Sequence, residues 1–270
     1  MHGSSRVAAK AAQDAFQRTL DGDVDCARLG EDLFAVTSAL DANIPLRRAV
    51  GDPSRDAAPK AALVEQLFGG RISAEAVEVV KSVVSQRWAE ERDLPDILEE
   101  LAVSSVVAGA EKQGRADQVE DDLFRFERIV AGNTGLRDAL TDRRSDVQGK
   151  DELISTLLGG KASDETVRLV RQAVRSPRGR RFDQVIERYL GIASVRREQL
   201  VAVVTSAIHL DASQRDRLVA ALANYYDKAV HLNVVVDPAV LGGIRVQVGD
   251  DVVDGTILRR LDTAKRLLGG

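Results

Sequence analysis

The chain has 270 residues, 44% hydrophobic and 30% charged, so it is long enough for one or two folded domains and too apolar to be disordered. Its formal net charge of -4 argues against non-specific binding to a polyanion over the whole surface. The single cysteine, Cys26, excludes an intramolecular disulfide and suits a reducing compartment. Residues 1–6 lack the apolar core of a signal peptide, and no run approaches the ~20 apolar residues that a bilayer span needs.

Charge is spread unevenly along the chain. Residues 1–115 carry 14 basic and 19 acidic side chains, whereas residues 116–200 carry 16 basic and 15 acidic side chains. An acidic partner would therefore prefer the middle of the chain.

The first 200 residues show apolar side chains at helical spacing. Aromatic residues make up only 4% of the chain, so we expect a core of Leu, Val and Ala, which suits packed helices. Gly69-Gly70 predicts a helix end, and Ser73 predicts the cap of the next helix. The other segments predicted to be helical are 7–20, 26–40, 44–50, 60–68 and 94–112.

An internal repeat follows. A shift of 90 residues lays Asp32–Lys81 over Asp122–Arg171 without a gap, and 18 of the 50 positions are identical. Average residue usage gives only about 3 identities by chance. A second long helix is expected over residues 180–195, so the pattern predicts two tandem bundles of five to six helices. The shared Gly-Gly corners indicate helix ends and not phosphate loops, because they lack both the Lys-Ser/Thr pair and the spaced upstream glycine of such a loop.

The last 70 residues change pattern. Leu200–Ser206 reads as a strand, and Asp211 with Gln214 forms a capping-box pattern for a helix over Ala212–Tyr226. β-Branched and alternating runs at 231–236, 244–248 and 252–253 predict further strands, and helical spacing resumes at Thr256. The predicted fold is mainly α: two tandem bundles, then a small α+β module in the order strand, helix, hairpin, helix. The predicted domains are 1–112, 113–199 and 200–270.

No set of residues supports catalysis, a cofactor or a metal. The three histidines, His2, His209 and His231, pair with no carboxylate at a metal-binding helical spacing, and Cys26 has no histidine near it. The aspartates at 250, 251 and 254 lack the spacing of a calcium loop and suit turn and cap roles. Catalytic, cofactor and metal residues are all predicted to be none.

The basic segment from Arg168 to Arg197 is the most suggestive functional feature. Three interpretations stay open: a solvated helix face, a surface for an acidic protein partner, or a nucleic-acid site, the last weakened by the lack of interleaved aromatic residues. The candidate partner contacts are Arg175, Arg178, Arg180 and Arg181. Trp88 and Phe182 are expected to pack in the core or at helix corners.

The C-terminal region carries a longer motif, D-P-x-x-L-G-G-I-x-V-x-V-G-D-x-V-x-D-G-T-I, followed by a helix that begins with R-x-L. It closely resembles the C-terminal signature of the δ subunit family of F-type ATP synthases, also called the oligomycin-sensitivity-conferring protein family. The resemblance covers roughly residues 103–270. Each signature position is expected to shape the fold, and none to perform chemistry. The matching positions are Asp237, Pro238, Leu241, Gly242, Gly243, Ile244, Val246, Val248, Gly249, Asp250, Val252, Asp254, Gly255, Thr256, Arg259 and Leu261.

The resemblance implies a non-catalytic stator subunit that links the catalytic head to the peripheral stalk and resists torque during proton-driven ATP synthesis. The implied partners are the N-terminal helices of the α subunits and the b subunit, with no nucleic acid. The implied location is the cytoplasmic face of the plasma membrane, held through partners only. The chain departs from most members in having two bundles, as in long forms among actinobacteria. We expect the second bundle to grip the head and the first to brace the stalk. The alternative function is a free helical-repeat adaptor that binds nucleic acid through the basic segment.

Overall fold

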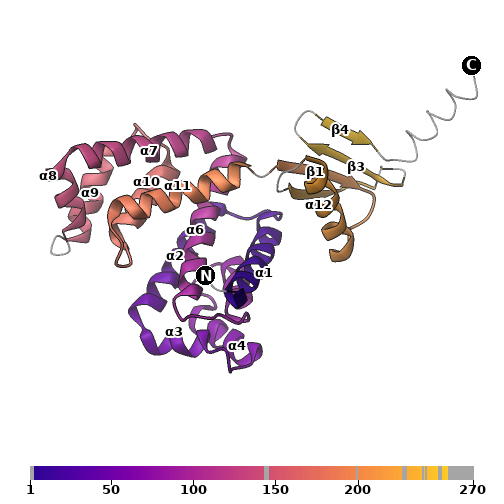
Figure 1. Ribbon diagram of the computed structural model, residues 1–270, viewed down its shortest axis with the longest axis horizontal. Coiled ribbons are helices and arrows are strands. Elements are labelled where there is room, and N and C mark those ends of the chain that lie inside the picture. Colours follow the sequence, from indigo (N-terminus) through magenta and orange to yellow (C-terminus); the bar gives the residue numbers. More distant parts are fainter. Residues whose placement is uncertain are drawn as a thin grey trace, which may run out of the picture. The chain divides into compact units, whose positions relative to one another are not determined.

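A computed structural model describes residues 3–142, 146–198, 200–226, 230–238, 240, 242–248 and 251–254. The chain divides into two compact units, Met1–Ser194 and Val195–Gly270, and each is described by itself. Helices make up the first unit, and a four-stranded sheet with one helix makes up the described part of the second (Figure 1). The mainly α fold with a small α+β part is confirmed.

The helices of the first unit follow the predicted segments closely. They are α1 (Gly3–Leu20), α2 (Cys26–Ala42), α3 (Ile44–Gly51), α4 (Ala57–Phe68), α5 (Ala74–Val84), α6 (Asp93–Lys112), α7 (Ala116–Gly132), α8 (Thr134–Thr141), α9 (Val147–Leu158), α10 (Asp164–Arg175) and α11 (Phe182–Glu198). The bounds of α2, α3 and α4 plus 90 give the bounds of α7, α8 and α9. The structure therefore repeats with the period that the sequence predicts.

Equivalent residues also make equivalent hydrogen bonds. The Asn43 side chain accepts from the Leu46 N–H at 3.0 Å to cap α3, and the Asn133 side chain accepts from the Leu136 N–H at 3.0 Å to cap α8. Such caps satisfy backbone donors that the first turn of a helix leaves open. The two copies thus share helix-capping hydrogen bonds as well as the spacing of their apolar residues.

A second pair of equivalents ties distant segments together. The buried Asp32 carboxylate in α2 accepts from the Ser73 N–H at 2.8 Å, and the buried Asp122 carboxylate in α7 accepts from the Ser163 N–H at 3.0 Å. Each bond fixes the corner before α5 or α10. That corner turns at Gly70 (φ 70°) in one copy and at Gly160 (φ 68°) in the other, where the left-handed backbone favours glycine. The helix-end interpretation of both Gly-Gly pairs is confirmed.

Helix α6 belongs to both copies. A 90-residue shift carries α1 onto α6, and the buried positions of α1 coincide with buried positions of α6. At the same time α6 is the last helix of the first copy, in the place that α11 takes in the second. Because α6 packs within both copies, it is buried on most of its circumference, which explains its long run of apolar residues. The buried apolar residues are Leu94, Pro95, Ile97, Leu98, Leu101, Ala102, Val103, Val106, Val107, Ala108 and Ala110.

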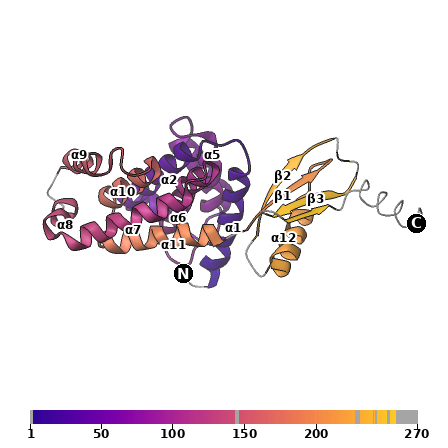
Figure 2. The ribbon, with the colours of Figure 1, turned by 90° about the horizontal axis from the view of Figure 1, so that it is seen from above.

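Helix α2 packs closely along α6. A Cβ added at Gly30 would lie 2.8 Å from Val106 Cγ2 and 3.2 Å from the Ala102 carbonyl oxygen, so the two backbones approach too closely for a side chain there. The Ser105 hydroxyl donates to the Cys26 carbonyl at 2.8 Å in the same interface. Cys26 is a buried free thiol, as expected of a structural residue. Figure 2 shows α2 and α6 within the body of the helical unit.

One hydrophobic core runs through both copies, from Ala8 in α1 to Ala193 in α11. Trp88 and Phe182 are both buried in it, as predicted, and Phe182 packs edge-on against Phe126 with ring centroids 6.1 Å apart. The expected domain boundary between residues 112 and 113 stays a prediction, although it falls inside this compact unit.

The second unit contains β1 (Leu200–Ser206), α12 (Ala212–Tyr226), β2 (Val230–Val236), β3 (Ile244–Val248) and β4 (Asp251–Asp254). The strand order is β2-β1-β3-β4, with β1 parallel to β2 and antiparallel to β3. A parallel pair needs a crossover connection, and α12 supplies it. The predicted order placed all strands after α12 in one hairpin, but only β3 and β4 pair in that way, whereas β2 lies at the sheet edge beside β1.

The capping box of α12 is confirmed in both directions. The Gln214 N–H donates to Asp211 Oδ1 at 2.7 Å, and the Asp211 N–H donates to Gln214 Oε1 at 2.9 Å. The core of this unit consists of Ala202, Val204, Leu222, Val230, Leu232, Val246 and Val248. The helix predicted from Thr256 lies outside the described residues.

Candidate partner-binding surface

The α10–α11 loop, residues 176–181, carries the candidate arginines in a strained turn. Pro177 cannot extend α10 past Arg175, because it lacks the N–H that a helix would use. Arg178 adopts φ 55° and Gly179 adopts φ 79°, two successive left-handed residues. That conformation is uncommon for a non-glycine residue, so the contacts of the Arg178 side chain must hold it.

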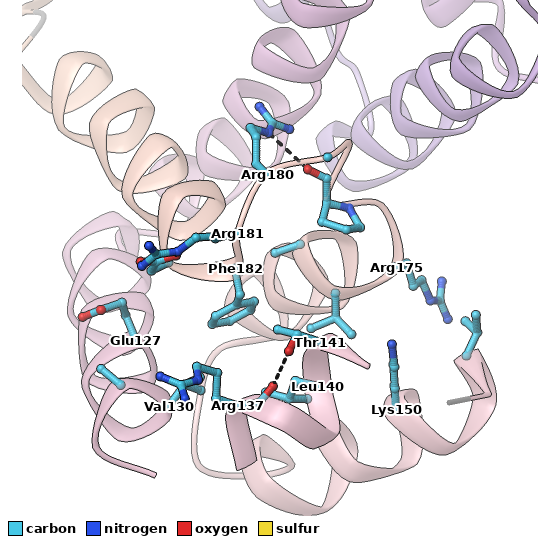
Figure 3. Close-up of a pocket in the computed structure, with 17 residues that line it drawn as sticks. Glu127, Val130, Arg137, Leu140, Thr141, Lys150, Arg175, Arg180, Arg181 and Phe182 are labelled. Carbon is cyan, nitrogen blue, oxygen red and sulfur yellow. Dashed lines mark hydrogen bonds and ion pairs between the residues drawn. The ribbon is translucent and has the colours of Figure 1, made fainter. Parts of the chain in front are cut away.

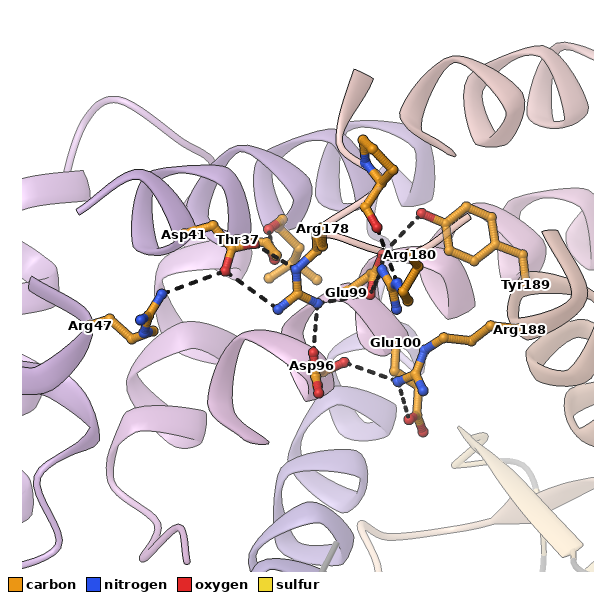
Figure 4. Close-up of polar contacts among 12 residues, drawn as sticks. Thr37, Asp41, Arg47, Asp96, Glu99, Glu100, Arg178, Arg180, Arg188 and Tyr189 are labelled. Atoms are coloured by element: carbon orange, nitrogen blue, oxygen red, sulfur yellow. Dashed lines mark hydrogen bonds and ion pairs between the residues drawn. The ribbon is translucent and has the colours of Figure 1, made fainter. Parts of the chain in front are cut away.

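Those contacts form an ion cluster around two buried side chains, Arg178 and Glu99 (Figure 4). Arg178 Nε lies 2.5 Å from Asp41 Oδ2 of α2, and its Nη1 lies 2.8 Å from Asp96 Oδ1 and 2.9 Å from Glu99 Oε2, both of α6. The Arg178 side chain is only 8% exposed and that of Glu99 1%. Burial lowers the pKa of Arg178, but Asp41, Glu99 and Asp96 together more than offset this, so its pKa stands above the ordinary value. The guanidinium is therefore a permanent cation inside the molecule.

Two further side chains of the second copy donate hydrogen bonds to Glu99. Arg180 Nη2 donates to Glu99 Oε1 at 2.5 Å, and the Tyr189 hydroxyl of α11 donates to the same oxygen at 3.2 Å. Burial, and then the neighbouring Glu99 charge, raise the pKa of Tyr189 well above 10.0. One carboxylate of α6 thus holds three side chains from the α10–α11 region.

Partly exposed ion pairs extend the same interface. Arg168 of α10 lies 3.1 Å from Glu31 of α2, and Arg188 of α11 lies 3.6 Å from Glu100 of α6. The acidic partner that the sequence predicts for the middle of the chain is, for these arginines, the first copy of the same chain. This pairing disfavours the nucleic-acid alternative, because the basic segment does not present a continuous free positive surface.

The four candidate contacts therefore separate into two kinds. Arg178 and Arg180 point inward and pair with Glu99 of α6, so both brace the two copies, and a partner role for them stays a prediction. Arg175 pairs with Asp151 of α9, and Arg181 pairs with the neighbouring Asp183; both arginines are at least half exposed. A partner role for Arg175 and Arg181 stays a prediction.

A pocket opens beside this loop in the second copy (Figure 3). It has a volume of about 1000 Å³ and is walled by α7, α8, α9, α10 and the loop that leads into α11. Its apolar lining includes Val130, Leu140, Val147, Ala173, Val174 and Phe182. Its polar lining includes Glu127, Arg137, Lys150, Arg175, Arg180, Arg181 and Asp183. Sequence reasoning missed this pocket, because nothing in the spacing of apolar residues shows where a core lacks volume.

The C-terminal signature positions that the structure describes have structural roles. Ile244, Val246 and Val248 form β3, with Val246 and Val248 buried, and Val252 pairs with Gln247 across β4. Gly242 and Gly243 have φ of 65° and 80°, as the turn before β3 requires. Leu241, Gly249, Asp250, Gly255 and Thr256 lie outside the described residues.

Within the described residues, no three His, Cys, Asp or Glu side chains are grouped so as to hold a metal ion. Over the same residues, every helix is too short or too polar to cross a bilayer.

Comparison with known proteins gives a consistent result. Residues 102–268 match the family model described as ATP synthase delta (OSCP) subunit. The chain is 49% identical over 267 residues to "ATP synthase subunit delta" of Kineococcus radiotolerans, covering 97% of each chain. It is 47% identical over 266 residues to the protein of that name from Streptomyces avermitilis, covering 98% of this chain and 97% of the relative. The protein of that name from Streptomyces coelicolor is 46% identical over 269 residues, with 99% and 98% covered.

These relatives are matched along nearly their whole length, so the additional N-terminal copy is part of the family's long form. The chain belongs to the ATP synthase delta (OSCP) subunit family, and it is a non-catalytic, peripheral stator subunit of the membrane ATP synthase.

Proposed function

We propose that this chain joins the N-terminal helices of the α subunits to the b subunit, at the cytoplasmic face of the plasma membrane. In this proposal the helical unit binds the head, and the C-terminal unit binds the b subunit. The subunit is held at the membrane through these partners, and it resists the torque that rotation exerts on the head.

The observation that carries the proposal is the bracing of the two helical copies. A link under torque must not bend at its own joints, and here the joint contains a shared helix, α6, and an ion cluster around the buried Glu99. Breaking a buried ion pair leaves an uncompensated buried charge, which costs about 3–5 kcal/mol. Such a joint resists bending far better than two domains on a flexible linker would.

A difference between the copies supports the second copy as the part that grips the head. Phe34 of α2 is 7% exposed, whereas its equivalent Phe124 of α7 is 56% exposed, and Ile129 of α7 is 55% exposed. Large exposed apolar side chains mark surfaces that partners cover. We propose that the first copy, whose equivalent position is already covered, braces the stalk.

Crosslinking mass spectrometry on intact ATP synthase in membranes tests the proposal. We expect crosslinks from residues 116–194 to α-subunit N-terminal segments, and crosslinks from residues 195–270 to the b subunit. Crosslinks from α1–α5 to α-subunit N-terminal segments, with none from the second copy, would reverse the assignment of the copies. A chain that never co-purifies with α and b subunits would refute the link itself.

A further inference from the structure

Two residues that line the pocket are smaller than their equivalents in the first copy, whereas two others, Leu140 for Val50 and Val147 for Ala57, are larger. Under the 90-residue shift, Leu40 becomes Val130 and Val83 becomes Ala173, and both smaller residues line the pocket. In the first copy, residues 85–92 link α5 to α6 and carry the buried Trp88. The corresponding linker, residues 176–181, is shorter and has no aromatic residue.

Trp88 shows what the first copy places against this wall. Its indole N–H donates to the Val83 carbonyl at 2.9 Å, and the Gln86 N–H donates to the same oxygen at 3.2 Å. In the second copy the equivalent carbonyl belongs to Ala173, which is 1% exposed, so a ligand in the pocket reaches it only when the adjoining wall moves.

The residue four positions after Ala173 is Pro177, which has no N–H to continue the helical hydrogen bonding. Across the residues that the structure describes, no other donor reaches this oxygen. A buried carbonyl without a donor is costly, so the site favours a ligand that brings one.

Lys150 adds a cation to the same pocket. Its equivalent in the first copy, Lys60, is 2% exposed and donates to the carbonyls of Asp52 at 3.3 Å and Gln86 at 3.4 Å. Lys150 is 9% exposed and lines the pocket, and its ammonium has no hydrogen bond or ion pair within the described part of the chain. The Lys150 ammonium keeps access to the pocket, and a cation without a counter-ion beside an apolar wall favours an anionic ligand. Figure 3 shows Lys150 rising from α9 on the side facing Arg175.

The other cations around the pocket contribute less. Arg175, Arg180 and Arg181 are already paired with Asp151, Glu99 and Asp183. Arg137 lies 3.7 Å from the exposed Asp138 on its own helix. The pocket therefore combines an apolar wall, one carbonyl that needs a donor and one ammonium that needs an acceptor.

We propose that this pocket receives a tryptophan side chain from a neighbouring subunit, with an acidic residue beside that tryptophan. The indole fills the volume that Trp88 fills in the first copy and donates its N–H to the Ala173 carbonyl. The adjacent carboxylate pairs with Lys150. In this proposal a partner subunit supplies to the second copy the tryptophan side chain that Trp88 supplies within the first copy. The source is a protein segment, an inference that rests on the proposed role as a link between subunits.

Indole-3-propionate is a minimal probe, because it joins an indole to one carboxylate. Ligand-observed nuclear magnetic resonance on the full chain should detect binding with a Kd on the order of 1 mM, the affinity typical of a ligand of this size. The neutral amide of the probe should bind about tenfold more weakly, since it cannot form the ion pair. No detectable binding of either probe would overturn the proposal.

Two variants and a control locate the probe. Ala173→Leu fills the pocket and should abolish binding of both probes. Lys150→Met should reduce binding of the carboxylate to that of the amide and leave the amide unchanged. Lys161→Met, at an exposed lysine outside the pocket, should change neither. Unfolding midpoints of all three variants establish that they fold, and probe binding that survives Ala173→Leu would overturn the assignment of the site.

The partner segment is identified in the intact ATP synthase. A photo-crosslinking amino acid at Thr141, which lines the pocket, should capture a peptide that contains a tryptophan next to Asp or Glu. Capture of a segment without a tryptophan, or no capture, would overturn the proposal. The Ala173→Leu chain also separates the two proposals: assembly with the head as good as that of wild type would overturn the pocket proposal and leave the stator role untouched. A chain that is wild type in sequence and fails to assemble would contradict the stator role.

Discussion

Arg178 Nη1 donates to Glu99 Oε2 at 2.9 Å, and this contact joins the α10–α11 loop to α6 across 79 residues of sequence. Both side chains are almost fully buried, so removing one takes from the other a charged partner that water cannot replace, although Arg178 keeps Asp41 and Asp96 and Glu99 keeps Arg180. We expect Arg178→Met or Glu99→Gln to lower the free energy of unfolding by about 3–5 kcal/mol. Urea denaturation followed by circular dichroism measures this. Arg181→Met, which removes an exposed pair, is the matched control and should leave the midpoint unchanged; equal midpoints for all variants would show that the cluster does not brace the copies.

Because Tyr189 is buried, we expect the folded chain to lose stability at alkaline pH. Burial and the neighbouring Glu99 raise its pKa well above 10.0, so the folded chain keeps this proton at pH values where the unfolded chain has lost it. The stabilising contribution is therefore complete below pH 10 and decreases as the pH rises above 10. Unfolding midpoints measured from pH 8 to pH 11 should decrease above pH 10. Tyr189→Phe should make the decrease smaller, and an identical pH dependence in both proteins would contradict the assignment.

Gly30 lies in the contact between α2 and α6, and we expect its substitution by a larger residue to lower stability. An added Cβ would lie 2.8 Å from Val106 Cγ2, closer than carbon atoms pack, so Gly30→Ala should cost about 1–3 kcal/mol through overpacking. Gly132→Ala is the control, because nothing lies within 4 Å of its added Cβ and the equivalent residue in the first copy is Ala42. We expect that control to be neutral or to stabilise α7. Thermal unfolding of both variants would reveal a wrong assignment if Gly30→Ala were the more stable.

Trp88 predicts a large cavity effect in the first copy. Its indole is 3% exposed and hydrogen-bonded to Val83, so Trp88→Ala should cost about 3–5 kcal/mol. Phe124→Ala removes an aromatic side chain that is 56% exposed and should change the midpoint little in the isolated subunit. The same Phe124 variant should reduce co-purification with the head if this surface is covered by a partner. A neutral Trp88→Ala would show that the indole is not a core element.

The shared helix predicts how fragments behave. A fragment of residues 113–199 lacks α6, which packs against α7 and α10, so it should show no cooperative thermal transition. The fragment 1–112 retains α6 with the rest of the first copy and should melt cooperatively. Residues 1–194 should melt in one transition. A cooperative transition for 113–199 alone would instead support an independent second domain.

Much of the fold could be predicted because its causes are local. Helix spacing, the caps at Asn43 and Asn133 and the Gly-Gly corners each depend on a few neighbouring residues, and the repeat could be found because those residues recur at one period. The family could be predicted from a dense motif around Gly242-Gly243.

Contacts between residues that lie far apart in the sequence were harder to predict from it. The sequence shows that Arg178 is basic but not that it faces Asp41 and Glu99, because those partners lie 137 and 79 residues away. The parallel pairing of β1 with β2 was equally hidden, since strand spacing does not fix strand order. The pocket was hidden as well, because its lining comes from α7, α8, α9, α10 and the loop before α11, which meet only in the folded chain.

The double use of α6 has a consequence for how such a subunit could lengthen. Each additional copy would need five new helices, because the last helix already present serves as the first helix of the next one. Each added copy would be joined to the previous one through a shared helix and not through a flexible hinge. The length of the stator subunit would grow by one repeat at a time, while its bending stiffness per repeat stayed the same.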